Sequence, residues 1–240
     1  GESPEPYIFI KENDSIAAAN TACQLVADGK ADFPMKGKVS TADFMRAVLD
    51  KSRGFVPKGG LISQATIIEN TQTHRMMLIT DCAINIAPDY AAKVKIMQNA
   101  VEVAHILGIE CPKVAAVAPI ETVNPAMQST IDAAMLAKAS ERGQFKGCVV
   151  DGPLGLDNAI NLEAAHMKDI TNSPVAGFAD ILLMPELTPA NFVHKIFHYY
   201  TDMHVVGVVC GTRVPVVMTS RTDEAISKYY AILMCILQSL

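Results

Sequence analysis

The sequence predicts an α/β fold built on a mostly parallel sheet. Apolar runs of strand length alternate along the chain with longer segments of helical periodicity. Most of these runs are continuously apolar, which is typical of parallel strands covered by helices on both faces. The chain has 240 residues, half of them hydrophobic, and is therefore long enough for one large or two modest α/β domains.

Capping and turn residues define the elements in order. Ser40 with Asp43 forms a capping box at the head of a helix, and Pro88 and Gly108 bracket a longer one. We expect strands at residues 7–10, 31–35, 61–68, 76–80, 114–118, 148–150, 180–184, 205–210 and 214–218. We expect helices at residues 14–29, 40–50, 88–108, 125–142, 157–168, 188–200 and 224–240.

Composition excludes several classes of partner. The net charge is −5 and no block of like charge occurs, which argues against a nucleic-acid or membrane surface. No apolar run reaches membrane-spanning length. The six cysteines show no C-x-x-C spacing, so we expect free, mostly buried thiols in a reducing cytoplasm. The first residues have no signal-peptide layout and no starting Met, so we expect the chain to begin partway through a longer protein.

The stretch from 214 to 240 is the strongest candidate for a binding site. An apolar strand is followed by a polar turn, and Ser220 with Asp223 fits the start of a helix. Arg221 is then expected beside the positive end of a helix dipole, where a cation is unfavourable unless an anion joins it. This arrangement indicates a pocket for a phosphate or a carboxylate. The alternative is that Ser220 only caps the helix and Arg221 extends into solvent.

A second helix head carries a similar group. Ser40 and Thr41 supply hydroxyls there, and Arg46 follows one turn later. Arg46 and Arg221 can bind one phosphoryl group together, because a guanidinium suits bidentate contacts with phosphate. The alternative is two unrelated caps. Polar residues are also expected at the carboxyl ends of the strands, where ligands gather in such sheets: Lys36, Asp81, Glu121, Asp151, Glu186, Ser220 and Arg221.

Other common sites are not supported. The sequence has neither the dinucleotide nor the P-loop glycine fingerprint, and it lacks a G-x-S-x-G elbow. His194 and His198 have a spacing that can bind metal, but no Glu stands between them and aromatic residues surround them. We expect them to pack or face solvent, and we expect no metal site.

Five segments, in their order and spacing, resemble the phosphate acetyl/butaryl transferase family. They are residues 40–46, 81–85, 151–158, 179–185 and 219–223. The last segment, with Thr219, Ser220, Arg221 and Asp223, is most similar to that of phosphate butyryltransferases. The resemblance implies transfer of an acyl group between coenzyme A and inorganic phosphate. It implies no permanently bound cofactor, with acyl-CoA and phosphate as substrates.

The resemblance also implies an architecture similar to isocitrate/isopropylmalate dehydrogenases. Two α/β domains would flank a cleft that holds the active site, usually in a homodimer. The first domain would comprise residues 1–57 and 208–240, with part of its N-terminal region missing. The second would comprise residues 58–207.

The family's site residues map onto positions already singled out. By resemblance, Arg46 and Arg221 clamp the phosphate, and Ser220 donates a hydrogen bond to the transition state. The rest of the phosphate and substrate pocket is expected to contain Lys36, Gly37, Ser40, Thr41, Asp223 and Ser227.

This chain departs from the family's pattern at three places. The carboxylate proposed as base in the acetyl enzymes falls at Ser227, so Asp223 or Glu224 are the substitutes. Ala190 stands where the family usually has Gly, and His194 where it usually has Tyr. The alternative function is therefore a non-catalytic relative that binds CoA or an acyl phosphate. A dehydrogenase is disfavoured because no metal-carboxylate cluster is evident.

Overall fold

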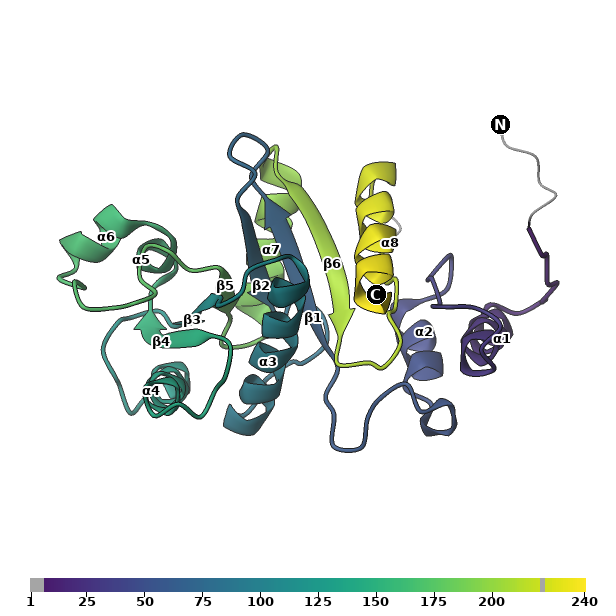
Figure 1. The fold of residues 1–240 in the computed structure, drawn as a ribbon, viewed down its shortest axis with the longest axis horizontal. Helices are drawn as coiled ribbons and strands as arrows, with labels where there is room; N and C mark the ends of the chain where they lie inside the picture. The colour runs from purple at the N-terminus through teal and green to yellow at the C-terminus, as the bar shows by residue number, and fades with distance from the viewer. Residues whose placement is uncertain (1–6, 221–222) are drawn as a thin grey trace.

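The computed structural model describes residues 7–220 and 223–240. Its strands form one six-stranded sheet in the order β4-β3-β5-β2-β1-β6 (Figure 1). The strands are β1 (Ser63–Glu69), β2 (Met76–Thr80), β3 (Lys113–Val117), β4 (Val149–Leu154), β5 (Ile181–Leu183) and β6 (His204–Cys210). β1 pairs antiparallel with both β2 and β6, and the other pairs are parallel. Within this sheet only β1 is reversed, and the predicted mostly parallel sheet is confirmed.

Helices cover both faces of the sheet. They are α1 (Ser15–Ala27), α2 (Thr41–Val48), α3 (Tyr90–Ile106), α4 (Gln128–Glu141), α5 (Leu156–Ile160), α6 (Leu162–Met167), α7 (Leu187–Tyr200) and α8 (Ala225–Ser239), with a short 3₁₀ helix η1 at Lys51–Arg53. α3, α4 and α8 share one apolar cluster with the sheet, through residues such as Met97, Leu136 and Met234. α5, α6 and α7 share a cluster on the other face, and Figure 1 shows α3 in front of the sheet and α7 behind it.

The first two helices form a separate apolar cluster beyond β6. Phe44 and Val48 of α2 are buried there with Val209 of β6 and with Val216 and Met218 from the segment ahead of α8. Figure 1 places α1 and α2 at one end of the molecule, and α4, α5 and α6 at the other. Among the described helices, none has both the length and the apolarity needed to cross a bilayer.

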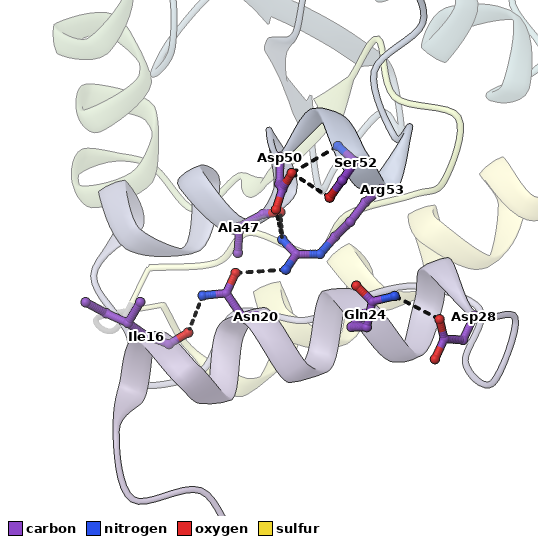
Figure 2. A network of polar contacts seen from close by, with 8 residues as sticks. All are labelled: Ile16, Asn20, Gln24, Asp28, Ala47, Asp50, Ser52 and Arg53. Carbon is purple, nitrogen blue, oxygen red and sulfur yellow. Dashed lines mark hydrogen bonds and ion pairs between the residues drawn. The ribbon is translucent and has the colours of Figure 1, made fainter.

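A buried guanidinium ties α1 to the end of α2 (Figure 2). Arg53 donates from Nη2 to Oδ1 of Asn20 at 2.9 Å and from Nη1 to the carbonyl of Ala47 at 2.5 Å. Asp50 accepts from the backbone N–H and the hydroxyl of Ser52, which fixes the turn that carries Arg53. These bonds hold the N-terminal helices as one unit next to the candidate site.

Four predicted elements are wrong in type or extent. Residues 7–10 form no strand, and the runs 31–35 and 214–218 make a single parallel bridge between Met35 and Val217. The helix predicted at 157–168 is two short helices, because Asn161 takes an extended conformation and caps α6. α8 begins at Ala225 after the N-cap Glu224, so Ser220 does not cap it.

The division into two domains stays a prediction. The described part of the chain contains one sheet, and the strands expected in the first domain are reduced to the bridge at Met35. The predicted boundary at 208 falls inside β6. The N-terminal helices nevertheless have an apolar cluster of their own, as a small first domain requires.

Candidate active site

A polar pocket of about 310 Å³ opens at the edge of the sheet where β2 ends and β1 begins. Segments from the whole length of the chain contribute to its wall. The lining residues are Lys36, Val39, Thr41, Gln64, Cys82, Ala83, Asn191, His194, Lys195, Met218, Thr219 and Ser220. Three of the predicted site residues, Lys36, Thr41 and Ser220, are therefore brought together.

One wall is built on the bridge between the two ends of the chain. Lys36 donates its backbone N–H to the carbonyl of Val217 at 2.9 Å, and Val217 donates to the carbonyl of Pro34 at 3.0 Å. This pairing fixes the buried Lys36, which is 6% exposed, near the segment that leads to Ser220. A cation and a hydroxyl thus line the same pocket, as anion binding requires.

The head of α2 completes that wall. Ser40 is the N-cap: its hydroxyl accepts the N–H of Asp43 at 3.1 Å and donates to the Asp43 carboxylate at 2.6 Å. The predicted capping box is confirmed. Thr41, the first residue of α2, lines the pocket. The Ser40 hydroxyl instead forms the hydrogen bonds of the cap.

The opposite wall comes from α7. Asn191 donates to the carbonyl of Cys82 at 3.1 Å and so holds the segment after β2 against the helix. One turn later, Nδ1 of His194 lies 3.3 Å from Oγ1 of the buried Thr66 in β1. Burial lowers the pKa of His194, and a positive charge on the neighbouring His198 lowers it further. The imidazole is therefore held in its neutral form at neutral pH.

Asp81 shapes the pocket without lining it. Its buried carboxylate accepts backbone N–H groups from Gln64 and from Ala83, Ile84 and Asn85. A carboxylate that accepts this many bonds is committed to holding the backbone. Its role is to fix the turn after β2, from which Cys82 and Ala83 reach the pocket.

Arg46 does not line this pocket in the structure. Its side chain is 70% exposed and forms an ion pair with Asp43 at 2.6 Å. It faces a separate hollow between α1 and α2, lined also by Asn20 and Asp50. Arg221 lies outside the described residues, so the meeting of the two guanidiniums on one anion stays a prediction.

The remaining predicted residues, Gly37, Asp223 and Ser227, are not part of the described lining of the pocket. Asp223 accepts the backbone N–H of Ser220 at 2.7 Å, and its carboxylate is 3.9 Å from Nε2 of His198. Gly37 follows Lys36 in the chain, and Ser227 is a partly buried residue in the first turn of α8.

Several residues that line the pocket were not predicted from the sequence as site residues. They are Gln64, Cys82, Asn191, His194, Lys195 and Thr219. His194 was expected to pack or face solvent, and in the structure it is partly buried against Thr66 and also lines the polar pocket. The one available signal was that His194 stands where the resembling family usually has Tyr.

A larger cavity of about 1310 Å³ lies at the carboxyl ends of β3, β4 and β5. Its wall is mostly apolar. Its buried charges are already matched, because Lys93 Nζ of α3 lies 2.6 Å from the carboxylate of Asp132 in α4. The pocket of Lys36 is the better candidate for chemistry on an anion, because it brings three predicted site residues, Lys36, Thr41 and Ser220, together.

The described residues also bear on metal binding and on thiol chemistry. Within the described residues no group of three or more His, Cys, Asp or Glu side chains could hold a metal ion. The cysteines are free, as predicted. Burial raises the pKa of Cys82 to about 12, and that of Cys210 to about 12, so neither thiol is a ready nucleophile.

Comparison with known proteins agrees with the motifs. A family model described as phosphate acetyl/butaryl transferase matches residues 11–236. The chain belongs to this family.

Its relatives include two curated transferases and a solved structure. A phosphate butyryltransferase of Clostridium acetobutylicum is 46% identical over 97% of this chain and 76% of its own length. A phosphate acetyltransferase of Thermotoga maritima is 41% identical over 90% of this chain and 72% of its own length. The crystal structure of a branched-chain phosphotransacylase from Enterococcus faecalis V583 superposes with a TM-score of 0.88 at 32% identity, covering 99% of this chain and 84% of that one.

Proposed function

We propose that this protein transfers a short acyl group, butyryl or a similar chain, between coenzyme A and inorganic phosphate. One observation carries the proposal. Three separate family segments, at 40–46, 81–85 and 219–223, contribute Thr41, Cys82 with Ala83, and Ser220 to one polar pocket. Acyl-CoA and phosphate are substrates in this proposal, and the protein needs no permanently bound cofactor.

Phosphate binding is assigned to Lys36, Thr41 and Ser220, with Gly37 and Ser40 supporting that wall. The Lys36 ammonium supplies charge in a largely buried position, and the two hydroxyls donate hydrogen bonds. Arg221 follows Ser220 directly in the chain, and we assign it to the phosphate as well.

Arg46 can join them only by leaving Asp43. That exposed ion pair is worth at most about 1 kcal/mol, so a phosphate bound in the pocket offsets the loss.

The reaction requires a stabilised oxyanion. The thiol sulfur attacks the carbonyl carbon of an acyl phosphate, and the bond from that carbon to the phosphate oxygen breaks. Cations near the phosphate stabilise the leaving group, and a hydroxyl donor such as Ser220 stabilises the tetrahedral oxyanion. We place Asp223 and Ser227 beside the pocket as groups that position the Ser220 turn, since Asp223 accepts the Ser220 N–H.

The first test is turnover and its dependence on Arg221. Purified protein should release free thiol from butyryl-CoA when phosphate is added. Arg221→Ala should abolish this release while circular dichroism and the melting temperature stay unchanged, because an arginine that the sequence predicts in a polar turn contributes little core packing. The matched control is Arg142→Ala, an exposed arginine after α4. A folded Arg221→Ala protein with near-normal turnover would rule out the clamp.

The second candidate is the non-catalytic relative that binds CoA or an acyl phosphate. The family's carboxylate base falls at Ser227 here, which is what favours it. Calorimetry with CoA and an assay with acetyl-, butyryl- and isobutyryl-CoA separate the two. Binding without thiol release identifies the binder, and the fastest of the three substrates identifies the acyl preference, since each methylene contributes roughly 1 kcal/mol of pocket contact.

Three further features belong to the proposal. The helices before residue 58 and the segment after 207 form one domain and residues 58–207 the other, on an architecture similar to isocitrate/isopropylmalate dehydrogenases with the reaction at their junction. The protein works as a homodimer, and it works in the cytoplasm. The apolar cluster of α1 and α2 supports the domain division.

A further inference from the structure

We propose that His194 is the general base that takes the proton from the coenzyme A thiol. This inference rests on the proposed transferase function and supplies the base that the family's carboxylate position, occupied here by Ser227, does not. A thiol is mostly protonated at neutral pH, and only the thiolate is a good nucleophile. A base in contact with the thiol is therefore needed in the same pocket as the phosphate.

The pocket places an imidazole among the proposed phosphate ligands. His194 lines it together with Lys36 and Ser220, which come from the other wall. His194 is partly buried on α7 and lines the pocket, so a ligand bound there can reach it. An acyl phosphate held by Lys36 and Ser220 would thus bring its carbonyl carbon within the space that His194 borders.

The contact with Thr66 is compatible with the tautomer that a base needs. Nδ1 of His194 lies 3.3 Å from Oγ1 of Thr66, a buried residue of β1. In that tautomer the imidazole donates this hydrogen bond and the Thr66 oxygen accepts it. Nδ1 then carries the proton of the neutral ring, and the lone pair lies on Nε2.

The charges around the ring keep it neutral. Burial is the largest effect, and it lowers the pKa of His194. The charges of His198 and Lys195, on the same helix, act in the same direction, and Asp223, from the segment ahead of α8, acts against them. Lys36 is the other cation in the lining, and β1 contributes the uncharged Gln64 to the lining and the uncharged Thr66 to the contact with His194. Since the folded pKa lies below the ordinary value near 6.5, Nε2 is available as a base at neutral pH.

In the proposed acyl transfer each bond that breaks is matched by one that forms, and the proton ends on the phosphate. The S–H bond breaks and its proton moves to Nε2 of His194, while the thiolate attacks the acyl carbon. The bond between that carbon and the phosphate oxygen breaks, and the imidazolium returns the proton to the leaving phosphate. The products are a thioester and hydrogen phosphate. In the reverse direction the imidazolium protonates the departing thiolate.

The test compares pH profiles of butyryl-CoA formation from butyryl phosphate and CoA. The wild-type rate should fall as the pH drops through the pKa of His194, below about 6.5, because the base becomes protonated. His194→Gln should lower kcat roughly 100-fold or more with little change in the KM for butyryl phosphate. Its rate should no longer fall as the pH drops through this range. His198→Gln removes a charge that lowers the His194 pKa. It should therefore move the fall in rate to higher pH and leave the maximal rate unchanged.

Controls keep the outcomes distinct. His166→Gln, at an exposed histidine of α6, should leave the rate and its fall at low pH unchanged. If His194→Gln fails to fold, His194→Ala with added imidazole is the second variant, and a base role requires at least a several-fold rescue. If a folded His194→Gln protein keeps the wild-type rate and the wild-type fall in rate at low pH, His194 is not the general base. That result would not contradict the proposed transferase function. No turnover by the wild-type chain would overturn both.

Discussion

At the scale of single residues, the pocket combines groups that the sequence separates widely. Lys36 is nearly buried, and a largely desolvated ammonium gains when an anion approaches. Thr41 and Ser220 add hydroxyl donors from two different segments. The same pocket contains His194, so the proposed phosphate cation and the proposed thiol base lie in one cavity.

The Lys36 ammonium can be tested against a neighbour. Lys36→Gln keeps most of the side-chain length and removes the charge, and a charged hydrogen bond is worth about 1.5–3 kcal/mol. The KM for phosphate should therefore rise by roughly 10- to 100-fold in a steady-state assay with butyryl-CoA. Lys38→Gln is the matched control, because Lys38 is exposed and two residues away. Equal effects of both changes would contradict a direct role of Lys36.

The sequence could predict part of this site. Thr41 and Ser220 could be predicted because family motifs mark their segments, and Lys36 could be predicted because it follows an expected strand. His194 could not, because its position depends on Thr66, which is 128 positions away in the chain. Histidines on a helix are ambiguous until the facing strand is known. Arg46 was expected at the anion, but in the structure its nearest counter-charge, Asp43, holds it in a separate hollow.

At the scale of elements, the ion pair of Lys93 and Asp132 joins α3 to α4 across the large apolar cavity. The two charged groups are 2.6 Å apart, and their side chains are only 7% and 5% exposed. Asp132 also accepts from Gln128 at 2.8 Å, so both carboxylate oxygens are engaged. Breaking one partner leaves an uncompensated buried charge.

Lys93→Met should therefore destabilise the protein by about 3–5 kcal/mol, whereas the double change Lys93→Met with Asp132→Leu should recover most of that loss. Urea unfolding followed by circular dichroism measures both. Lys95→Met, on an exposed position of the same helix, is the control and should change the free energy of unfolding by less than about 1 kcal/mol. A double variant less stable than Lys93→Met would refute the reasoning.

Elements with their own strong signals were predictable, and those that depend on partners were not. β2 has the predicted bounds, and α3 ends just before Gly108 as its cap indicates. The run 214–218 is as apolar as a strand, but among the described residues it forms only a single bridge, to Met35. Pro34 and Pro215 have no N–H to donate, which limits any ladder between these segments. Strand direction also escaped prediction, since no local pattern marks β1 as reversed.

At the scale of the whole molecule, surface carboxylates link stability to pH. The pKa of Glu121 is lowered chiefly by a hydrogen bond from Lys168, and the same lysine lowers the pKa of Asp157. These bonds connect the segment after β3 to α5 and to the residue after α6. A carboxyl with a depressed folded pKa stabilises the protein above its unfolded pKa, and that stability is lost as the pH falls through the folded value.

The contribution of these two carboxyls to the melting temperature should thus be constant above their ordinary pKa values of 4.5 and 3.8 and should decline as the pH falls below them. The melting temperature of Lys168→Gln should fall less on acidification than that of the wild type, because Glu121 and Asp157 have lost their lysine partner. Lys146→Gln, at an exposed lysine, should follow the wild-type curve. Calorimetry from pH 7 down to about pH 3 measures this, and identical curves for all three proteins would exclude the Lys168 cluster as a contributor.

The lone backbone bridge at Met35 and Val217 has a consequence for engineering. It joins the segment around Met35 to the segment around Val217 at the rim of the pocket, through two hydrogen bonds. Changes near residue 35 and changes near residue 217 will therefore not act additively, because each displaces the other's backbone. A combinatorial library that seeks a new acyl preference should randomise both stretches together, since one-at-a-time scans would overlook compensating pairs.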